Sequence, residues 1–376
     1  MTTRTASAIL TAMAACLLLA ACGGKGSATG HSPGGDTLTH TSEFLTMIDR
    51  GDYTEVVIAD PFHATGVPLA HLALVDSEDC DVPNGCTALR VPLERSVVFS
   101  SVHTSPVFEL GAGEAVTGVA DAGYFADGDT VASLLATGHV ADVGSSVSPS
   151  AERILALEAQ AVLLSPMQNS DNSVLRRSGI TVVPMADYME RTPLGRAEWI
   201  KLLGALYGCE EKADSIYKNV CLSYNRLCSA TEGKARPRVL TENLISGVWY
   251  VPGGRSYMAR MLADAGADYP WSHIERDGSL PLDASGVLDK GADADIWLMR
   301  TFGAAPSARE LKKTNPAAEH IKAFKNGNVY VCDTSQKNIF NDIAFHPERV
   351  LRDFVIIFHP DALPGEQPHY YEKMTR

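Results

Sequence analysis

Hydrophobic and polar positions change their rhythm along the chain, and the changes divide it into parts. From residue 53 to 91, apolar and polar residues alternate in runs such as "YTEVVIAD" and "LAHLALV", with turn-forming residues between them. This alternation predicts a β-hairpin extension. From residue 92, short apolar runs such as "SVVFSS" and "AVLLSP" take turns with helical patterns such as "SPSAERILALE". Strands alternating with helices predict a parallel sheet covered on both faces, so we expect an α/β lobe.

A long helical pattern interrupts this alternation. Residues 194–229 carry apolar side chains at three- and four-residue steps, over a length that few globular helices reach. Gly204 and Gly208 are the positions at which we expect it to divide, because glycine weakens a helix. The α/β alternation resumes after residue 235. The predicted fold class is therefore α/β, with two Rossmann-like lobes at residues 42–192, including the extension, and 236–376, joined by a linking helix at 193–235.

The first residues have the layout of an export signal. "MTTRTASAILTAMAACLLLAACGGKGS" holds one arginine, an apolar run too short to span a membrane, small residues and Cys22. "Leu19-Ala20-Ala21-Cys22" resembles the bacterial lipoprotein box, which implies that a leader of residues 1–21 is removed and that Cys22 carries a lipid. A plain secretory signal is the alternative. Residues 22–41 have the composition of a flexible tether, so we expect a location in the periplasm or at the cell surface, anchored to the membrane.

Composition and charge narrow the function. The chain has 376 residues, of which 45% are hydrophobic and 20% charged, as in ordinary globular proteins. Its net charge of −13 argues against a nucleic-acid partner. Cys80 and Cys86 flank the turn-forming stretch "DVPNG", so we expect a disulfide between them in an oxidising compartment.

Catalytic motifs are not found, whereas a binding cleft is well supported. The chain has no Gly-x-Ser-x-Gly, no His-Glu-x-x-His and no phosphate loop, so we expect no enzyme, assign no metal ligands and expect no cofactor. Ligands of open parallel sheets lie at the carboxyl ends of the strands. Aromatic rings and guanidinium groups in those loops suit a bulky ligand with flat faces and acidic groups. The candidate ligand-binding residues are His103, Tyr124, Met167, Tyr188, Arg191, Trp249, Tyr250, Arg255, Trp271 and Arg300.

Some of these residues have a second interpretation. Trp249 and Tyr250 are neighbours in one predicted strand, so they point to opposite faces and one of them belongs to the core. His103 is either a metal ligand or a hydrogen-bonding residue, and Arg255 either faces the ligand or caps a helix. The turn Pro252-Gly253-Gly254 is expected to bring its backbone close to the cleft.

Several stretches in a fixed order resemble one known family. They are "ERSVVFSSVHTSPVFELGAGEAVTGVAD", "SPSAERILALEAQAVLLSP", "ADIWLMR", "FKNGNVYVCD" and "HPERVLRDFVIIFHPD". Between Pro92 and Pro360 the chain resembles the class III periplasmic binding proteins of ABC importers, which capture iron–siderophores, haem or cobalamin. The resemblance implies a monomer that delivers a small-molecule metal chelate to permease subunits.

The resemblance also implies two docking residues. Glu152 matches the family's first docking glutamate, and the second position falls near Ser285, so Asp283 is the candidate substitute. We expect a ferric siderophore or related iron complex as ligand, with haem and cobalamin as alternatives in the same class. A bare-metal binder, a lipid-anchored enzyme and an adhesion lipoprotein without a cleft are the remaining alternatives.

Overall fold

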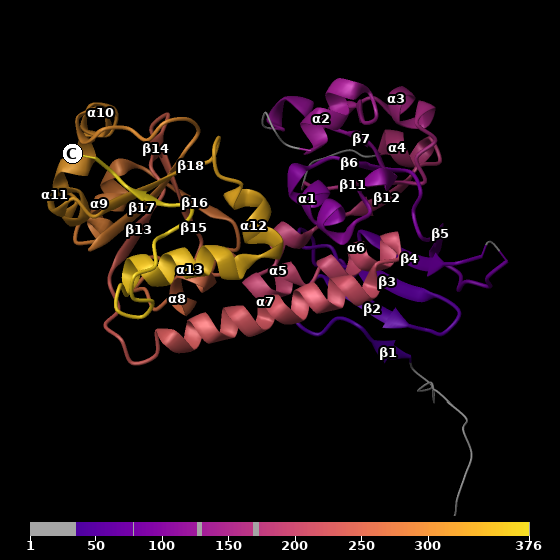
Figure 1. Cartoon of the computed structure of the whole chain (residues 1–376), viewed down its shortest axis with the longest axis horizontal. Helices are drawn as coiled ribbons and strands as arrows, with labels where there is room; N and C mark the ends of the chain where they lie inside the picture. The colour runs from indigo at the N-terminus through magenta and orange to yellow at the C-terminus, as the bar shows by residue number, and fades with distance from the viewer. Residues whose placement is uncertain (1–34, 78, 126–129, 168–172, 376) are drawn as a thin grey trace, which may run out of the picture.

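Two α/β lobes stand side by side above a long helix (Figure 1). The computed structural model describes residues 35–77, 79–125, 130–167 and 173–375. The sheet of the N-terminal lobe is wholly parallel, in the order β12-β11-β6-β7-β8. Its strands are β6 (Ser96–Val98), β7 (Val116–Val119), β8 (Ala141–Asp142), β11 (Ala161–Leu164) and β12 (Thr181–Pro184), and its helices are α1 (Ser101–Leu110), α2 (Thr130–Thr137), α3 (Ala151–Ala156) and α4 (Ser173–Arg177). The short strands β9 (Gly144–Ser145) and β10 (Ser148–Pro149) pair separately. The predicted α/β class is confirmed.

The C-terminal lobe contains two sheets. Parallel strands β13 (Val239–Thr241), β17 (Ile296–Thr301) and β18 (Val329–Asp333) form the first, and β19 (Glu372–Lys373) adds an antiparallel edge. The second is antiparallel and consists of β14 (Leu244–Ile245), β15 (Val248–Pro252) and β16 (Ser279–Leu282). The helices are α8 (Tyr257–Asp264), α9 (Ala284–Gly291), α10 (Ala308–Thr314), α11 (Lys322–Asn326), α12 (Ile339–Phe345) and α13 (Pro347–Phe358).

The segment between the lobes is divided into three helices. They are α5 (Pro193–Ala197), α6 (Ile200–Tyr207) and α7 (Glu210–Ala230). Gly208 ends α6 with φ of 67°, a left-handed conformation that favours glycine. Gly204 does not divide the helix; a Cβ there would lie 2.6 Å from that of Ala213, so the glycine lets α6 and α7 pack closely. Because α7 packs on α6 and on α13, it contacts both lobes (Figure 1).

The N-terminal extension is larger than the predicted hairpin. It is a five-stranded sheet of β1 (Asp36–Thr37), β2 (Leu45–Asp49), β3 (Thr54–Ile58), β4 (Ala70–Val75) and β5 (Thr87–Arg90). One face buries Met47, Val56 and Leu72 in the same core as Trp199 and Leu203 of the linking segment. The extension is therefore fused to the N-terminal lobe through a shared apolar core.

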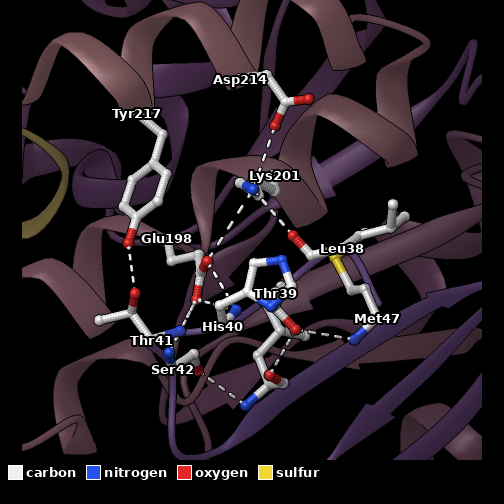
Figure 2. A network of polar contacts seen from close by, with 11 residues as sticks. Leu38, Thr39, His40, Thr41, Ser42, Met47, Glu198, Lys201, Asp214 and Tyr217 are labelled. Atoms are coloured by element: carbon white, nitrogen blue, oxygen red, sulfur yellow. Dashed lines mark hydrogen bonds and ion pairs between the residues drawn. The ribbon is translucent and has the colours of Figure 1, made fainter. Parts of the chain in front are cut away.

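A buried carboxylate fixes the start of this sheet. Glu198, 1% exposed, accepts hydrogen bonds from the backbone N–H groups of His40, Thr41 and Ser42 at 2.7–3.1 Å (Figure 2). Lys201 lies 4.0 Å from the same carboxylate and donates to the carbonyl of Leu38 at 2.8 Å. A second carboxylate, that of Glu190, accepts from the N–H groups of residues 43 and 44 and from the indole of Trp199. Backbone N–H groups of the irregular connection between β1 and β2 thus obtain carboxylate partners.

The expectations about Cys22 and about the Cys80–Cys86 disulfide have different outcomes. Cys22 lies outside the described residues, and in the part that is described no helix has the length and apolarity to span a membrane. The predicted disulfide is not formed: Cys80 and Cys86 are free thiols. The Cys80 thiol donates to the carbonyl of Asp52 at 3.4 Å, whereas the Cys86 sulfur lies 3.1 Å from Nε2 of His71. Each sulfur therefore has a partner other than the second sulfur.

Candidate ligand-binding cleft

A cavity of about 610 Å³ lies between the lobes. In the N-terminal lobe its walls come chiefly from the loops that follow β6, β7 and β11, and in the C-terminal lobe from those that follow β17 and β18. All of these are carboxyl ends of parallel strands, where the geometry of open sheets places ligands. The volume falls within the range of small-molecule sites.

Aromatic rings and neutral polar groups dominate the cavity wall. The N-terminal lobe contributes the rings of Phe99, Tyr124 and Phe125, and the C-terminal lobe those of Phe302 and Phe340. Tyr124 is 78% and Phe302 84% exposed, which is unusual for such large side chains and indicates surfaces available to a ligand. Hydroxyl and amide groups complete the wall, from Ser100, Ser101, Ser146, Ser165, Thr334, Ser335, Asn338 and Asn341.

Fixed charge is sparse in the cavity. Among the described residues that line it, Lys337 and Asp121 are the only lysine, arginine, aspartate or glutamate side chains. Their charges are opposite, so the lining carries little net charge. A ligand held here is recognised mainly through ring contacts and hydrogen bonds.

Two of the ten predicted ligand-binding residues, Tyr124 and Met167, line the cavity. The other eight do not line it, and each is engaged elsewhere or lies outside. Tyr124 and Met167 lie in loops that follow parallel strands of the N-terminal lobe, β7 and β11 respectively.

The three predicted arginines are paired with carboxylates. Arg191 forms ion pairs with Glu43 and, at 2.8 Å, with Asp277, and Arg255 lies 3.2 Å from the same Asp277. The Arg191–Asp277 pair connects the lobes outside the cavity, and neither arginine lines the cavity.

Arg300 contributes to the cavity wall indirectly. Its guanidinium pairs with Glu242 and lies over the ring of Phe340, 5.2 Å from the ring centroid. Phe340 is a cavity residue. Arg300 therefore stabilises one wall through a cation–π contact and does not itself line the cavity.

The two predicted tryptophans belong to the core. Trp249 is fully buried, stacks on Trp297 with ring centroids 5.4 Å apart, and donates its indole N–H to the carbonyl of Thr241 at 2.9 Å. Trp271 is 2% exposed and packs edge-to-face against Tyr269. Tyr250 is the exposed member of the Trp249–Tyr250 pair, but it lies outside the cavity lining. The reason is topological: β15 belongs to the antiparallel sheet, to which the carboxyl-end rule does not apply.

The Pro252-Gly253-Gly254 turn approaches another loop and not the cleft. A Cβ at Gly253 would lie 2.3 Å from the carbonyl oxygen of Arg276, and one at Gly254 would lie 2.4 Å from that of Ser272. The glycines are therefore needed for backbone-to-backbone packing against residues 271–278, and the expectation that this turn borders the cleft is corrected.

His103 and Tyr188 support the cleft from within the N-terminal lobe. His103 is 1% exposed, and its Nε2 lies 2.8 Å from Asp187, which also accepts from Arg196 at 3.0 Å. Burial opposes ionisation of Asp187, but His103 and Arg196 hold its pKa below the ordinary value. Tyr188 donates its hydroxyl to the carbonyl of Pro166, beside the cavity residue Met167, and burial raises the pKa of Tyr188 to about 12.

The loop after β18 and the start of α12 line the cavity, although no ligand-binding residue was predicted there. The loop provides Lys337 and Asn338, and the start of α12 provides Phe340 and Asn341. Asn341 also accepts a hydrogen bond from the hydroxyl of Ser101 at 3.4 Å. The signal was present in "VYVCDTSQKNIFN", because the carboxyl-end rule applies to this parallel strand as it does to the others.

The candidate docking residues occupy the first turns of two helices. Glu152 is exposed in the first turn of α3, two residues after the cap Ser150. Asp283 is itself the cap of α9 and accepts from the N–H of Gly286 at 2.7 Å. Glu152 lies two residues after the cap of α3, and the residue two after the cap of α9 is Ser285. Asp283 is the cap itself and lies directly before the first residue of α9.

Comparison with known proteins now identifies the family. A family model for periplasmic binding proteins matches residues 97–335. The chain belongs to the periplasmic binding protein family. Its class III resemblance is confirmed by the lobe–helix–lobe architecture. A relative named as an uncharacterized lipoprotein of Methanocaldococcus jannaschii is 29% identical over 298 residues, which cover 76% of this chain and 70% of the relative.

Two solved structures show the same fold. A periplasmic heme binding protein of Pseudomonas aeruginosa superposes with a TM-score of 0.57 at 18% identity, over 75% of this chain and 98% of the other. A protein of an ABC-type Fe3+-hydroxamate transport system from Saccharomonospora viridis gives a TM-score of 0.56 at 19% identity, over 71% of this chain and 94% of the other. The family consists of substrate-binding proteins that serve transporters.

Proposed function

We propose that this chain captures a ferric siderophore or a related iron complex between its lobes and delivers it to an ABC permease. The observation that carries the proposal is the cavity itself: about 610 Å³, bounded by both lobes and lined by exposed rings and hydroxyl groups. A chelate with apolar outer faces gains contact area from such rings, and the hydroxyl groups fix its orientation. An adhesion lipoprotein would need no such cavity.

The sparse charge of the cavity favours a chelate close to neutrality. A ligand with several anionic groups would need several cations, but Lys337 is the only lysine or arginine among the described lining residues and Asp121 opposes it. Three hydroxamate groups neutralise Fe3+, whereas three catecholates leave a trianion. We therefore favour a ferric trihydroxamate over a ferric tricatecholate. A bare ion is disfavoured, since no histidine or cysteine occurs among those lining residues.

A titration of the purified full chain tests this choice. Ferric trihydroxamate, ferric tricatecholate, haem and cobalamin are each titrated and followed by calorimetry and visible absorbance. We expect saturable one-to-one binding of the trihydroxamate and at least about tenfold weaker binding of the tricatecholate, equivalent to about 1.4 kcal/mol. Binding of none of the four would reject the proposal.

Haem is the second candidate because of two side chains on the wall. Tyr124 and Met167 are side-chain types that serve as axial haem ligands, and Tyr124 is the more exposed of the two. If haem is the ligand, titration produces a Soret band that changes position in Tyr124→Phe. A spectrum identical to that of free haem removes this candidate.

Delivery requires a membrane location and a docking surface. We infer that the leader 1–21 is removed, that Cys22 is lipidated, and that the segment between Cys22 and β1 tethers a monomer to the membrane in the periplasm or at the cell surface. Residues 36–41 of the predicted tether 22–41 belong instead to the folded extension, because they include β1 and the backbone groups bound by Glu198. Family members act as substrate carriers, so we infer no catalytic activity. Glu152 is the docking residue of the N-terminal lobe, and Asp283 is the candidate on the C-terminal lobe.

A further inference from the structure

Three side chains with metal-binding chemistry meet on the N-terminal extension, outside the cavity. Glu55 lies in β3, His71 in β4, and Cys86 directly before β5. One ligand atom from each lies within 4.8 Å of the others. Strands β4 and β5 lie on the side of the molecule remote from the C-terminal lobe (Figure 1).

Strand register brings the three side chains together. In the antiparallel pair β3–β4, Val57 is the partner of His71, and Glu55 precedes Val57 by two residues, so Glu55 and His71 share one face of the sheet. In the parallel pair β4–β5, Thr87 is the partner of Leu72, which places Cys86 beside His71. The intervening residues point to the opposite face, where Leu72 enters the core.

The donor atoms converge on His71 Nε2. It lies 2.8 Å from Oε1 of Glu55 and 3.1 Å from Sγ of Cys86. Tetrahedral zinc with its usual bond lengths to N, O and S separates such donor pairs by about 3.4 and 3.6 Å. Each observed separation is thus about half an ångström shorter than zinc requires, a difference that side-chain rotation can supply. His71 is 32% and Glu55 17% exposed in its side chain, so an ion can enter from solvent.

Arg50 completes the arrangement as a positioning residue. Its Nε donates to Oε2 of Glu55 at 2.8 Å, which leaves Oε1 turned toward His71. Partners of this kind orient the ligands of metal sites.

We propose that Glu55, His71 and Cys86 bind one divalent ion of the zinc class on the extension, with water in the fourth position. One imidazole, one thiolate and one carboxylate form a ligand set that suits Zn2+ and Co2+ and does not suit Mg2+ or Ca2+. A thiol binds a metal ion as its thiolate, so the proton of the Cys86 thiol has to leave. Binding replaces the S–H bond by a metal–sulfur bond and releases this proton to solvent.

Metal titration of the full chain tests the site, with a matched control in the same sheet. The protein is stripped with EDTA under reducing conditions and titrated with Zn2+ against a chromophoric chelator, and with Co2+ by absorbance. We expect one ion per chain, a thiolate-to-cobalt absorption band, and release of about one proton per ion. Cys86→Ser should abolish the band and weaken zinc binding more than about 100-fold, since even the loss of a hydrogen-bond partner of a metal ligand costs about 10–100-fold.

Cys80→Ser is the control, because Cys80 is the other free thiol of the extension and donates a hydrogen bond to the backbone carbonyl of Asp52. It should leave both the zinc affinity and the cobalt band unchanged. Equal loss in Cys80→Ser, a full band in Cys86→Ser, or no stoichiometric binding would each overturn the site. Cys86→Ser should also bind the cleft ligand as the unaltered chain does, so this result is independent of the cargo.

Discussion

His346 and Glu109 connect the two lobes through a direct contact. Nε2 of His346 lies 2.7 Å from a carboxylate oxygen of Glu109. Glu109 belongs to α1 of the N-terminal lobe, and His346 joins α12 to α13 in the C-terminal lobe. Burial opposes protonation of His346, but Glu109 and Glu348 raise its pKa to about 9. Ser101 of α1 and Asn341 of α12 both line the cavity. The ion pair between His346 and Glu109 therefore helps to set the spacing of the cavity walls.

Stability should depend on pH through this pair. The pKa of His346 is raised in the folded chain, so its contribution is complete below the unfolded value near 6.5 and is lost as the pH rises through about 9. We expect His346→Gln to lower the free energy of unfolding by on the order of 1–2 kcal/mol at pH 6, a figure reduced for the 36% exposure of Glu109. The difference should vanish by about pH 10. Chemical denaturation at several pH values measures it.

The exposed His139 provides the control for this experiment. His139→Gln should leave the free energy of unfolding unchanged at every pH. A His346→Gln deficit that is the same at pH 6 and pH 10 would show that His346 contributes packing and not charge.

Rings from both lobes should contribute to ligand affinity. Tyr124 and Phe302 are exposed on the cavity wall, whereas Tyr250, 49% exposed, lies outside it. We expect Tyr124→Ala and Phe302→Ala each to weaken binding by about 1 kcal/mol, and Tyr250→Ala to have no effect. Calorimetric titration with whichever of the four candidate ligands binds the unaltered chain gives the values. If Tyr250→Ala weakens binding as much as the other two, the ligand occupies another surface.

The alternation of strands and helices was enough to predict the lobes, but not which strands form the parallel sheets. "VWYVP" has the composition of any buried strand, and nothing local distinguishes β15 from the parallel β17. Pairing depends on contacts between distant segments. Trp249 and Trp271 were therefore assigned to the cleft although they lie in the core.

Charge pairing was equally hidden in the sequence. Arg191 and Arg255 both form ion pairs with Asp277, which lies 86 residues beyond Arg191 along the chain. These pairs engage the guanidinium groups that were predicted to bind ligand. Tyr124 and Met167, which were predicted to bind ligand, do line the cavity, because each needs only its own strand to end in a loop. The C-terminal tail is a further long-range case: buried Asp353 accepts the N–H groups of Tyr370 and Tyr371, and the tail enters the core.

The docking proposal can be separated from helix capping. Glu152→Ala should leave ligand affinity unchanged and reduce uptake by cells that express the permease, because Glu152 is exposed away from the cavity lining. Asp283→Ser removes the charge but keeps a side chain that can cap α9. If Asp283 docks, this variant also reduces uptake while its melting temperature stays the same. Normal uptake in both variants would remove the docking assignment.

The carboxylate of Glu198 should be essential for the N-terminal segment. It is the acceptor for three backbone N–H groups of residues 40–42, in a buried position (Figure 2). We expect Glu198→Ala to cost about 2–4 kcal/mol, because these donors lose an ionised partner. Glu198→Gln keeps one oxygen acceptor and should cost less. Limited proteolysis should cut near residues 35–50 in the alanine variant first; equal resistance in both variants would contradict this role.

The glycine pair that follows Pro252 gives a sharp test of backbone packing. A Cβ at Gly253 would approach carbonyl oxygens of Arg276 and Gly278 at 2.3 and 2.5 Å, distances that require the loop to shift. Gly278 lies in the loop that is contacted, and a Cβ there meets nothing within 4 Å. We expect Gly253→Ala to lower the free energy of unfolding by about 2 kcal/mol or more, as overpacking does, and Gly278→Ala to change it by less than about 0.5 kcal/mol. Because this turn is remote from the cavity lining, ligand affinity of the folded fraction should be unchanged in both variants. Weakened binding in Gly253→Ala at full stability would place the turn back at the cleft.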